Sequence, residues 1–163
     1  MKALTLYSLA VFFLMMVFLA GSSVPAVSEA FIKLGEISGE CSDKDHAGWS
    51  DVVRWQGTLR PISIRKSSGG SGQIAAGKIV VIKPADISSD ELKKMCSDSV
   101  RIPEVRFEIL KPGSEPPQYL VYILKDVVIT SIWQEYSGDL DSQIVDSLSL
   151  NFEYGEYHLR VLN

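Results

Sequence analysis

The sequence has few of the side chains on which catalytic sites depend. It contains only two histidines and two cysteines, and it has no G-x-S-x-G motif or other legible nucleophile grouping. Cys41 lies a few residues before His46, but a nucleophilic pair also needs an orienting third group and an oxyanion site. His158 has no evident nucleophile beside it. We therefore expect no catalytic residue and a protein that is not an enzyme.

A metal site is also poorly supported by the residue spacing. Glu40, Asp43 and Asp45 lie close to His46 in the sequence, and these four side chains are candidate metal ligands. Calcium loops, however, follow an Asp-x-Asp-x-Asp-Gly pattern with a distal Glu. Here Lys44 stands between two of the aspartates, and the glycine of that pattern is missing. The sequence therefore predicts a solvated or partner-facing loop and no metal ion.

The charge pattern gives no sign of a nucleic-acid or nucleotide ligand. The formal net charge is −4, and no run of like charges is present. The Ser- and Gly-rich tract at 67–72 predicts a mobile loop. It does not fit a phosphate-binding loop, because Gly77-Lys78 is followed by Ile79 where that motif has Ser or Thr. We expect no cofactor and no nucleic-acid partner.

Residues 1–30 have the pattern of a secretory signal peptide. A largely apolar run over residues 3–20 is followed by small residues. We expect cleavage between Ala30 and Phe31, with a cut after Ala26 as an alternative. An uncleaved membrane anchor is the competing interpretation, since the run is almost long enough to span a bilayer. If the leader is cleaved, we expect only the leader to contact the membrane and the mature domain to be secreted or periplasmic.

The two cysteines allow a disulfide bond. Cys41 and Cys96 both lie in the part that would be exported, where the environment permits bridges. A bridge between them could contribute about 2–4 kcal/mol of stability. The alternative is two free thiols, one buried on a helix and one in a loop.

The mature domain, residues 31–163, has the alternation of a mainly β fold. Apolar residues recur at every second position, and the clearest example is the stretch 148–154. A polar break at Asp126 predicts a bulge or bend within long strands. Such a set of strands with one helix favours a small antiparallel β-barrel, the helix lying outside it or across an open end. The earlier strands are expected at 31–37, 51–59 and 78–83.

A single helix is expected after Ser88. This residue is a natural N-cap, and Glu91 stands where it would complete a capping box. Leu92, Met95 and Cys96 form one apolar stripe that can pack on a sheet.

A long polar loop, Ser38–Ser50, separates the first two expected strands. Long ordered loops in compact domains are usually functional. Trp49 at the end of the loop is a candidate subunit contact, because aromatic residues are enriched at the centres of interfaces. Trp55 and Trp133 lie in expected strands and are interpreted as core or interface anchors.

The same region resembles the haemolysin-coregulated proteins (Hcp), the tube subunits of bacterial type VI secretion. The order FIKLGEISGECSDKDHAGWSDVVRW over residues 31–55 carries the match, and GKIVVIKPAD and SLSLNF extend it across nearly all of 31–154. The resemblance implies a small β-barrel with one flanking helix that packs into six-fold rings. It also implies that the polar loop reaches a neighbouring subunit or the ring above. The implied interface residues are Glu40, Ser42, Asp43, Lys44, His46 and Trp49.

The expected leader departs from that family, whose subunits are loaded from the cytoplasm. We therefore interpret the chain as an exported, non-enzymatic ring or tube protein of Hcp type. It would assemble as a homohexamer and could meet a secreted effector or another secretion component. The alternative is a monomeric secreted or periplasmic binding module that retains the barrel without tube assembly. A secreted hydrolase or toxin is a third hypothesis.

Overall fold

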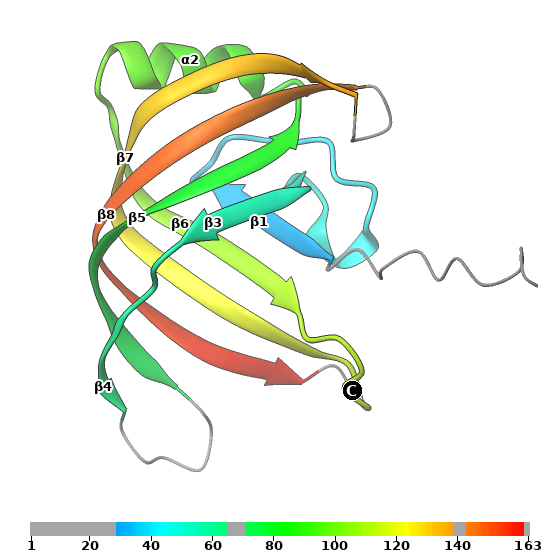
Figure 1. Cartoon of the computed structure of the whole chain (residues 1–163), viewed down its shortest axis with the longest axis vertical. Coiled ribbons are helices and arrows are strands. Elements are labelled where there is room, and N and C mark those ends of the chain that lie inside the picture. Colours follow the sequence, from blue (N-terminus) through cyan, green and yellow to red (C-terminus); the bar gives the residue numbers. More distant parts are fainter. Residues whose placement is uncertain (1–28, 65–70, 139–142, 162–163) are drawn as a thin grey trace, which may run out of the picture.

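The strands form a curled antiparallel sheet. The computed structural model describes residues 29–64, 71–138 and 143–161, and the statements below concern these residues. The elements are β1 (Ala30–Leu34), η1 (Lys44–His46), β2 (Ser50–Asp51), β3 (Arg54–Gly57), β4 (Pro61–Ile64), β5 (Gly72–Pro84), α2 (Ser89–Ser97), β6 (Arg101–Leu110), β7 (Gln118–Ser137) and β8 (Gln143–Val161). The strand order is β2-β1-β6-β7-β8-β5-β3, with β4 beside β5. Figure 1 shows the sheet curling into a half-open barrel, with α2 across its upper end. The predicted mainly β fold class is confirmed.

Some expectations fall on other parts of the chain. The leader and the 67–72 tract lie mostly outside the described residues. Among the described residues, no helix has the length and apolar character needed to cross a membrane.

One short segment closes the upper part of the barrel. The backbone N–H of Val52 donates to Ala30 O over 2.8 Å, and that of Val53 donates to Ile82 O over 2.9 Å. Consecutive residues therefore pair with β1 on one edge of the sheet and with β5 on the other. This change of partner divides the strand expected at 51–59 into β2 and β3. Trp55 on β3 then contacts Phe107 on β6, with ring centroids 5.3 Å apart.

Neighbouring strands change their inward-facing side at the same level of the barrel. Leu124 and Val127 on β7 are both fully buried, although simple alternation would place them on opposite faces. Asp126 between them has a φ of 53°, which confirms the predicted interruption of this strand. For the same reason the alternation expected over 148–154 ends early, and Tyr154 is 54% exposed. The corresponding inward pairs on β6, β8 and β5 are Ile102 and Val105, Phe152 and Gly155, and Gly77 and Ile74.

The helix α2 packs against β7 through the predicted apolar stripe. Leu92 is fully buried, and Met95 and Cys96 pack against the core. Ser88 is the N-cap residue, but the predicted capping box is wrong. Ser88 has helical φ and ψ and makes no side-chain cap. Its hydroxyl donates instead to Asp86 Oδ1 over 2.5 Å.

The first strand is shorter than expected. It ends at Leu34 rather than Ile37, because Gly35 turns the chain with a φ of 59°. This turn directs the polar loop away from the sheet edge and back over the outside of the barrel.

Candidate functional site

The polar loop between β1 and β2 packs against the outer face of its own barrel. A small apolar cluster lies there, separate from the main core, and Cys41 and Trp49 of the loop pack against it. Lys33 Nζ fixes both ends of the loop, donating to Ile37 O and to Gly48 O over 2.9 Å each. We call the covered residues the outer cluster, which comprises Phe31, Tyr119, Val121 and Ile123.

His46 anchors the loop at the centre of this contact. Its side chain is 1% exposed, and its ring stacks on Phe31 at a centroid distance of 3.9 Å. Nδ1 lies 2.6 Å from Asp43 Oδ1, and Nε2 lies 3.1 Å from Glu108 Oε2 on β6. Arg160 Nη2 on β8 donates to the same glutamate oxygen over 2.5 Å. A series of polar contacts therefore links Asp43 and His46 of the loop, through Glu108 on β6, to Arg160 on β8.

The predicted interface residues fall into different environments. Glu40, Ser42 and Lys44 are exposed, and Asp43 and Trp49 are half-buried. The ring of His46 is enclosed by residues of its own chain. The acidic residues that lie near His46 in the sequence do not gather around one point in the structure. Glu40 Oε2 accepts a hydrogen bond from Ile87 N, whereas Asp43 bonds to His46.

Both cysteines are free thiols in the structure. Cys41 Sγ donates to Asp51 Oδ1 over 3.1 Å. Burial is the main cause that raises the pKa of Cys41 to about 11, with the nearby carboxylate of Asp51 adding to the effect. The Cys41 thiol is therefore protonated at neutral pH, and protonated thiols are poor nucleophiles. Cys96 lies half-buried on α2.

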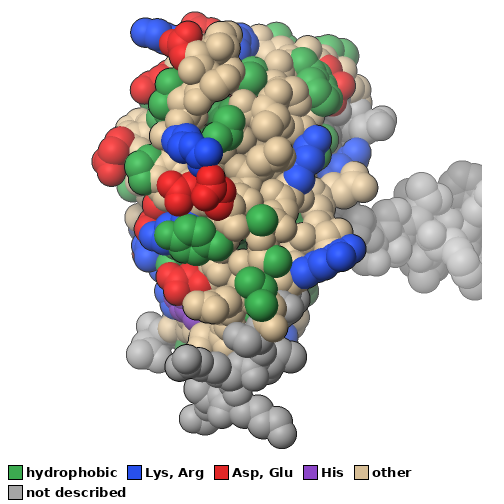
Figure 2. All heavy atoms as spheres, turned by 90° about the vertical axis from the view of Figure 1, so that its left-hand side faces the viewer, with side chains coloured by type: hydrophobic (Ala, Val, Ile, Leu, Met, Phe, Trp, Pro, Cys, Tyr) green, Lys and Arg blue, Asp and Glu red, His purple; other side chains and the backbone are tan. Residues whose placement is uncertain are grey.

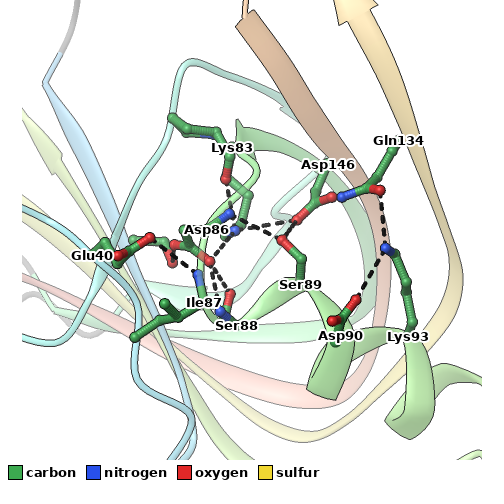
Figure 3. A network of polar contacts seen from close by, with 12 residues as sticks. Glu40, Lys83, Asp86, Ile87, Ser88, Ser89, Asp90, Lys93, Gln134 and Asp146 are labelled. Atoms are coloured by element: carbon green, nitrogen blue, oxygen red, sulfur yellow. Dashed lines mark hydrogen bonds and ion pairs between the residues drawn. The ribbon is translucent and has the colours of Figure 1, made fainter.

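A second polar site surrounds a buried lysine at the end of β5. Lys83 is fully buried, and its Nζ donates to Pro84 O and Asp86 Oδ1 over 2.8 Å each. It also donates to Asp146 Oδ2 on β8 over 3.3 Å. The ammonium group thus has three acceptors, which matches its three donor hydrogens. Figure 3 shows these side chains pointing toward one another between β5, β8 and the start of α2.

This lysine site connects the loop, the helix and the sheet. Ser50 Oγ donates to Asp86 Oδ2 over 2.8 Å, and Ser89 Oγ donates to Asp146 Oδ2 over 2.5 Å. Burial alone would raise the pKa of Asp86, but hydrogen bonds from Lys83 and Ser88 outweigh it and hold that pKa below its usual value. The loop and α2 are therefore fixed to the barrel by one continuous polar network.

The outer face of the upper barrel forms an uncharged band. Two rows of residues that pair across β5, β8 and β7 face outward there. The residues next to them along each strand face the core. Trp133 is its largest member and is 50% exposed. Figure 2 views this side of the barrel and shows a strip without charged side chains between charged residues on either side. The band consists of Val80, Ile82, Ser131, Trp133, Ser147 and Ser149.

The profile of the family described as "Type VI secretion system effector, Hcp" matches residues 31–158. The chain belongs to the Hcp family. It is 33% identical over 127 residues to Protein hcp1 of Pseudomonas aeruginosa, a match that covers 76% of this chain and 78% of that protein. The resemblance found in the sequence is thereby confirmed.

Solved Hcp structures share the fold. Hcp1 from Salmonella typhimurium superposes with a TM-score of 0.61 at 22% identity, covering 78% of this chain and 85% of that chain. A type VI secretion system effector from Yersinia pestis gives a TM-score of 0.56 at 21% identity, covering 82% of this chain and 99% of that one. The half-open barrel with one flanking helix is therefore the Hcp fold.

Family membership settles the broad function. Hcp proteins are structural tube proteins of type VI secretion, and this chain is a structural protein of that type. Within the ranges described here, no group of three or more His, Cys, Asp or Glu residues is placed to hold a metal ion. The residues that sequence reasoning missed are Lys83, Asp146 and Glu108, which are buried charges. Glu108 and Asp146 have partners that are distant in the sequence. Lys83 combines Asp86, three residues on, with the distant Asp146, so no local motif reveals the whole site.

Proposed function

We propose that this Hcp-family chain is exported with a cleaved leader and assembles into a six-membered ring through its uncharged outer band. The observation that carries the proposal is the band itself. Sheet surfaces that face water normally carry charged and polar side chains. Here Val80 and Ile82 face outward beside Trp133, with small serines between them.

The composition of the band suits a protein interface. The centres of interfaces are depleted in charged residues and enriched in aromatic ones. Ser147 and Ser149 are only 4% and 3% exposed, so Trp133 and the half-buried Val80 and Ile82 supply most of the accessible surface of the band. A ring is a heterologous interface, so the band of one copy would meet a different surface of the next copy. A secreted effector or another secretion component remains a candidate partner for the completed ring.

Trp133→Glu should convert the ring into monomers. A charge at the centre of the band would be buried without a partner on assembly, and such burial is costly. Native mass spectrometry of the mature chain should show six subunits for the wild type and one for the variant. Tyr154→Glu is the matched control, because Tyr154 is an aromatic residue outside the band and is 54% exposed. It should leave the mass at six subunits.

Two results would contradict the proposal in different ways. A wild-type monomer at micromolar concentration would favour the monomeric binding module. A ring that survives Trp133→Glu would place the interface elsewhere on the barrel. Circular dichroism of each variant checks that the barrel itself is intact.

The leader should be cut after Ala26 rather than after Ala30. Ala30 belongs to β1, is 4% exposed and pairs with Ile109. The carbonyl oxygens of Glu29 and Ala30 each accept a backbone hydrogen bond over 2.8 Å. Removing these residues would strip backbone partners from Val52 and Leu110. This supports the alternative site over the boundary between Ala30 and Phe31.

N-terminal sequencing of the exported protein tests this proposal. We expect the mature chain to begin at Val27. A chain that begins at Phe31 would show that the sheet tolerates the loss of its first residues. A chain that retains Met1 would favour the uncleaved anchor. Expression without the leader serves as a control for cleavage by other proteases.

A further inference from the structure

We propose that His46 is a proton-operated latch that holds the polar loop closed over the outer cluster. Both of its ring nitrogens face carboxylate oxygens, those of Asp43 and Glu108. An ionised carboxylate only accepts hydrogen bonds, so each nitrogen must donate for both contacts to form. Only the imidazolium form carries a hydrogen on both nitrogens. Both contacts can therefore be hydrogen bonds to ionised carboxylates only when the ring carries both protons.

The groups around the ring favour that charge. The hydrogen bond from His46 is the main cause that holds the pKa of Asp43 below its usual value. Burial is the main cause that raises the pKa of Tyr119, so this neighbour stays uncharged through mildly alkaline pH. β1 contributes the uncharged ring of Phe31 and the ammonium group of Lys33, which bonds to Gly48 O in the same loop. The other titratable and charged groups near the ring are Asp43, Lys44 and Asp45 on the loop, Glu108 on β6, Tyr119 on β7 and Arg160 on β8.

Loss of the proton would break the latch at one of its two contacts. A neutral imidazole keeps one N–H and turns a lone pair toward the other carboxylate. Because His46 is buried, water cannot easily replace the lost hydrogen bond. Glu108 also keeps its bond to Arg160. The part of the loop around His46 would then detach from the barrel and uncover the outer cluster, while Lys33 still holds the two ends of the loop. Histidine is the side chain that commonly titrates between about pH 5 and pH 8.

Hydrogen exchange of the full mature chain tests the latch. The probe is the protection of loop amides over residues 38–50, corrected for intrinsic exchange rates, at about pH 6 and about pH 9. We expect protection to fall by about tenfold or more at the higher pH, as for the loss of one charged hydrogen bond. The amides of β7 and β8 should keep their protection and serve as the internal control.

Glu108→Gln should abolish the pH dependence while leaving the loop closed. The glutamine NH₂ group, placed where Glu108 Oε2 lies, can donate to a neutral His46 ring. Arg160 bonds to that same oxygen in the wild type, so its side chain must turn to the amide oxygen of the variant. Asp45→Asn is the matched control, because Asp45 is exposed in the same turn, whereas the ring nitrogens of His46 face Asp43 and Glu108. This control should keep the wild-type dependence. Equal pH dependence in wild type and Glu108→Gln would overturn the proposal.

Nitrogen NMR of the His46 ring gives a second test that needs no variant. We expect both ring nitrogens to carry protons wherever the loop amides are protected. The second proton should disappear over the same pH range in which protection is lost. A neutral ring with a fully protected loop would overturn the latch. Neither measurement depends on ring assembly, so the latch and the outer-band proposal can fail separately.

Discussion

Lys83→Met lowers the free energy of unfolding by about 3–5 kcal/mol, which is the usual loss when one partner of a buried ion pair is removed. The lysine is fully buried and satisfies Asp86 and Asp146 at once. Methionine has a similar length but leaves both carboxylates without their cation. Urea denaturation followed by circular dichroism measures the change.

Lys93→Met is the matched control for this prediction. Lys93 pairs with Asp90 at the surface, where the two side chains are 40% and 98% exposed. Exposed pairs contribute about 0–1 kcal/mol, so this variant should be nearly as stable as the wild type. Adding Asp86→Asn and Asp146→Asn to Lys83→Met should recover part of the loss, because the buried negative charges are removed. Equal stability of the two lysine variants would contradict the role assigned to the network.

Phe107→Ala is the second large expected effect, with a loss of about 3–5 kcal/mol. Phe107 is fully buried on β6. Its ring meets Trp55 from the closing segment at a centroid distance of 5.3 Å and stacks near Tyr122 at 6.3 Å. Alanine would leave a cavity at the point where β3 completes the barrel. Thermal and urea unfolding measure the loss.

Phe107→Leu separates the cavity from the loss of the aromatic contact. Leucine refills most of the space, so this variant should lose much less stability than Phe107→Ala. The fluorescence of Trp55 should change in both variants, since its edge contact is removed in each. If Phe107→Ala lowers the free energy of unfolding no more than Phe107→Leu does, the closing segment does not depend on this packing.

Much of the fold could be predicted from local patterns. The alternation through Leu148, Leu150 and Phe152 located an inward-facing row of β8, because strand periodicity is a local property. The break at Asp126 was also visible, since a polar residue interrupts two apolar runs. The helix after Ser88 was predicted from its apolar stripe. The family resemblance then identified the barrel.

The rest depends on strand register, which local patterns do not contain. From the sequence, Lys83 would be placed at the surface after an apolar strand. Its burial depends on Asp86 together with Asp146, which the register of β5 and β8 brings opposite it. The sequence likewise places His46 in a solvated loop, because its partner Glu108 lies far away in the sequence. The capping box failed because Asp86 competes for the Ser88 hydroxyl. Partners that are distant in the sequence therefore determine which polar side chains are buried.

The coordinated change of inward side around Asp126 limits how these genes can evolve by insertion and deletion. Adding or removing one codon within β5, β6, β7 or β8 would turn an entire half-strand inside out relative to its neighbours. Substitutions alter a single position and leave that alignment intact. Length variation should therefore concentrate in the connecting turns, and a tag or fused peptide is best introduced there.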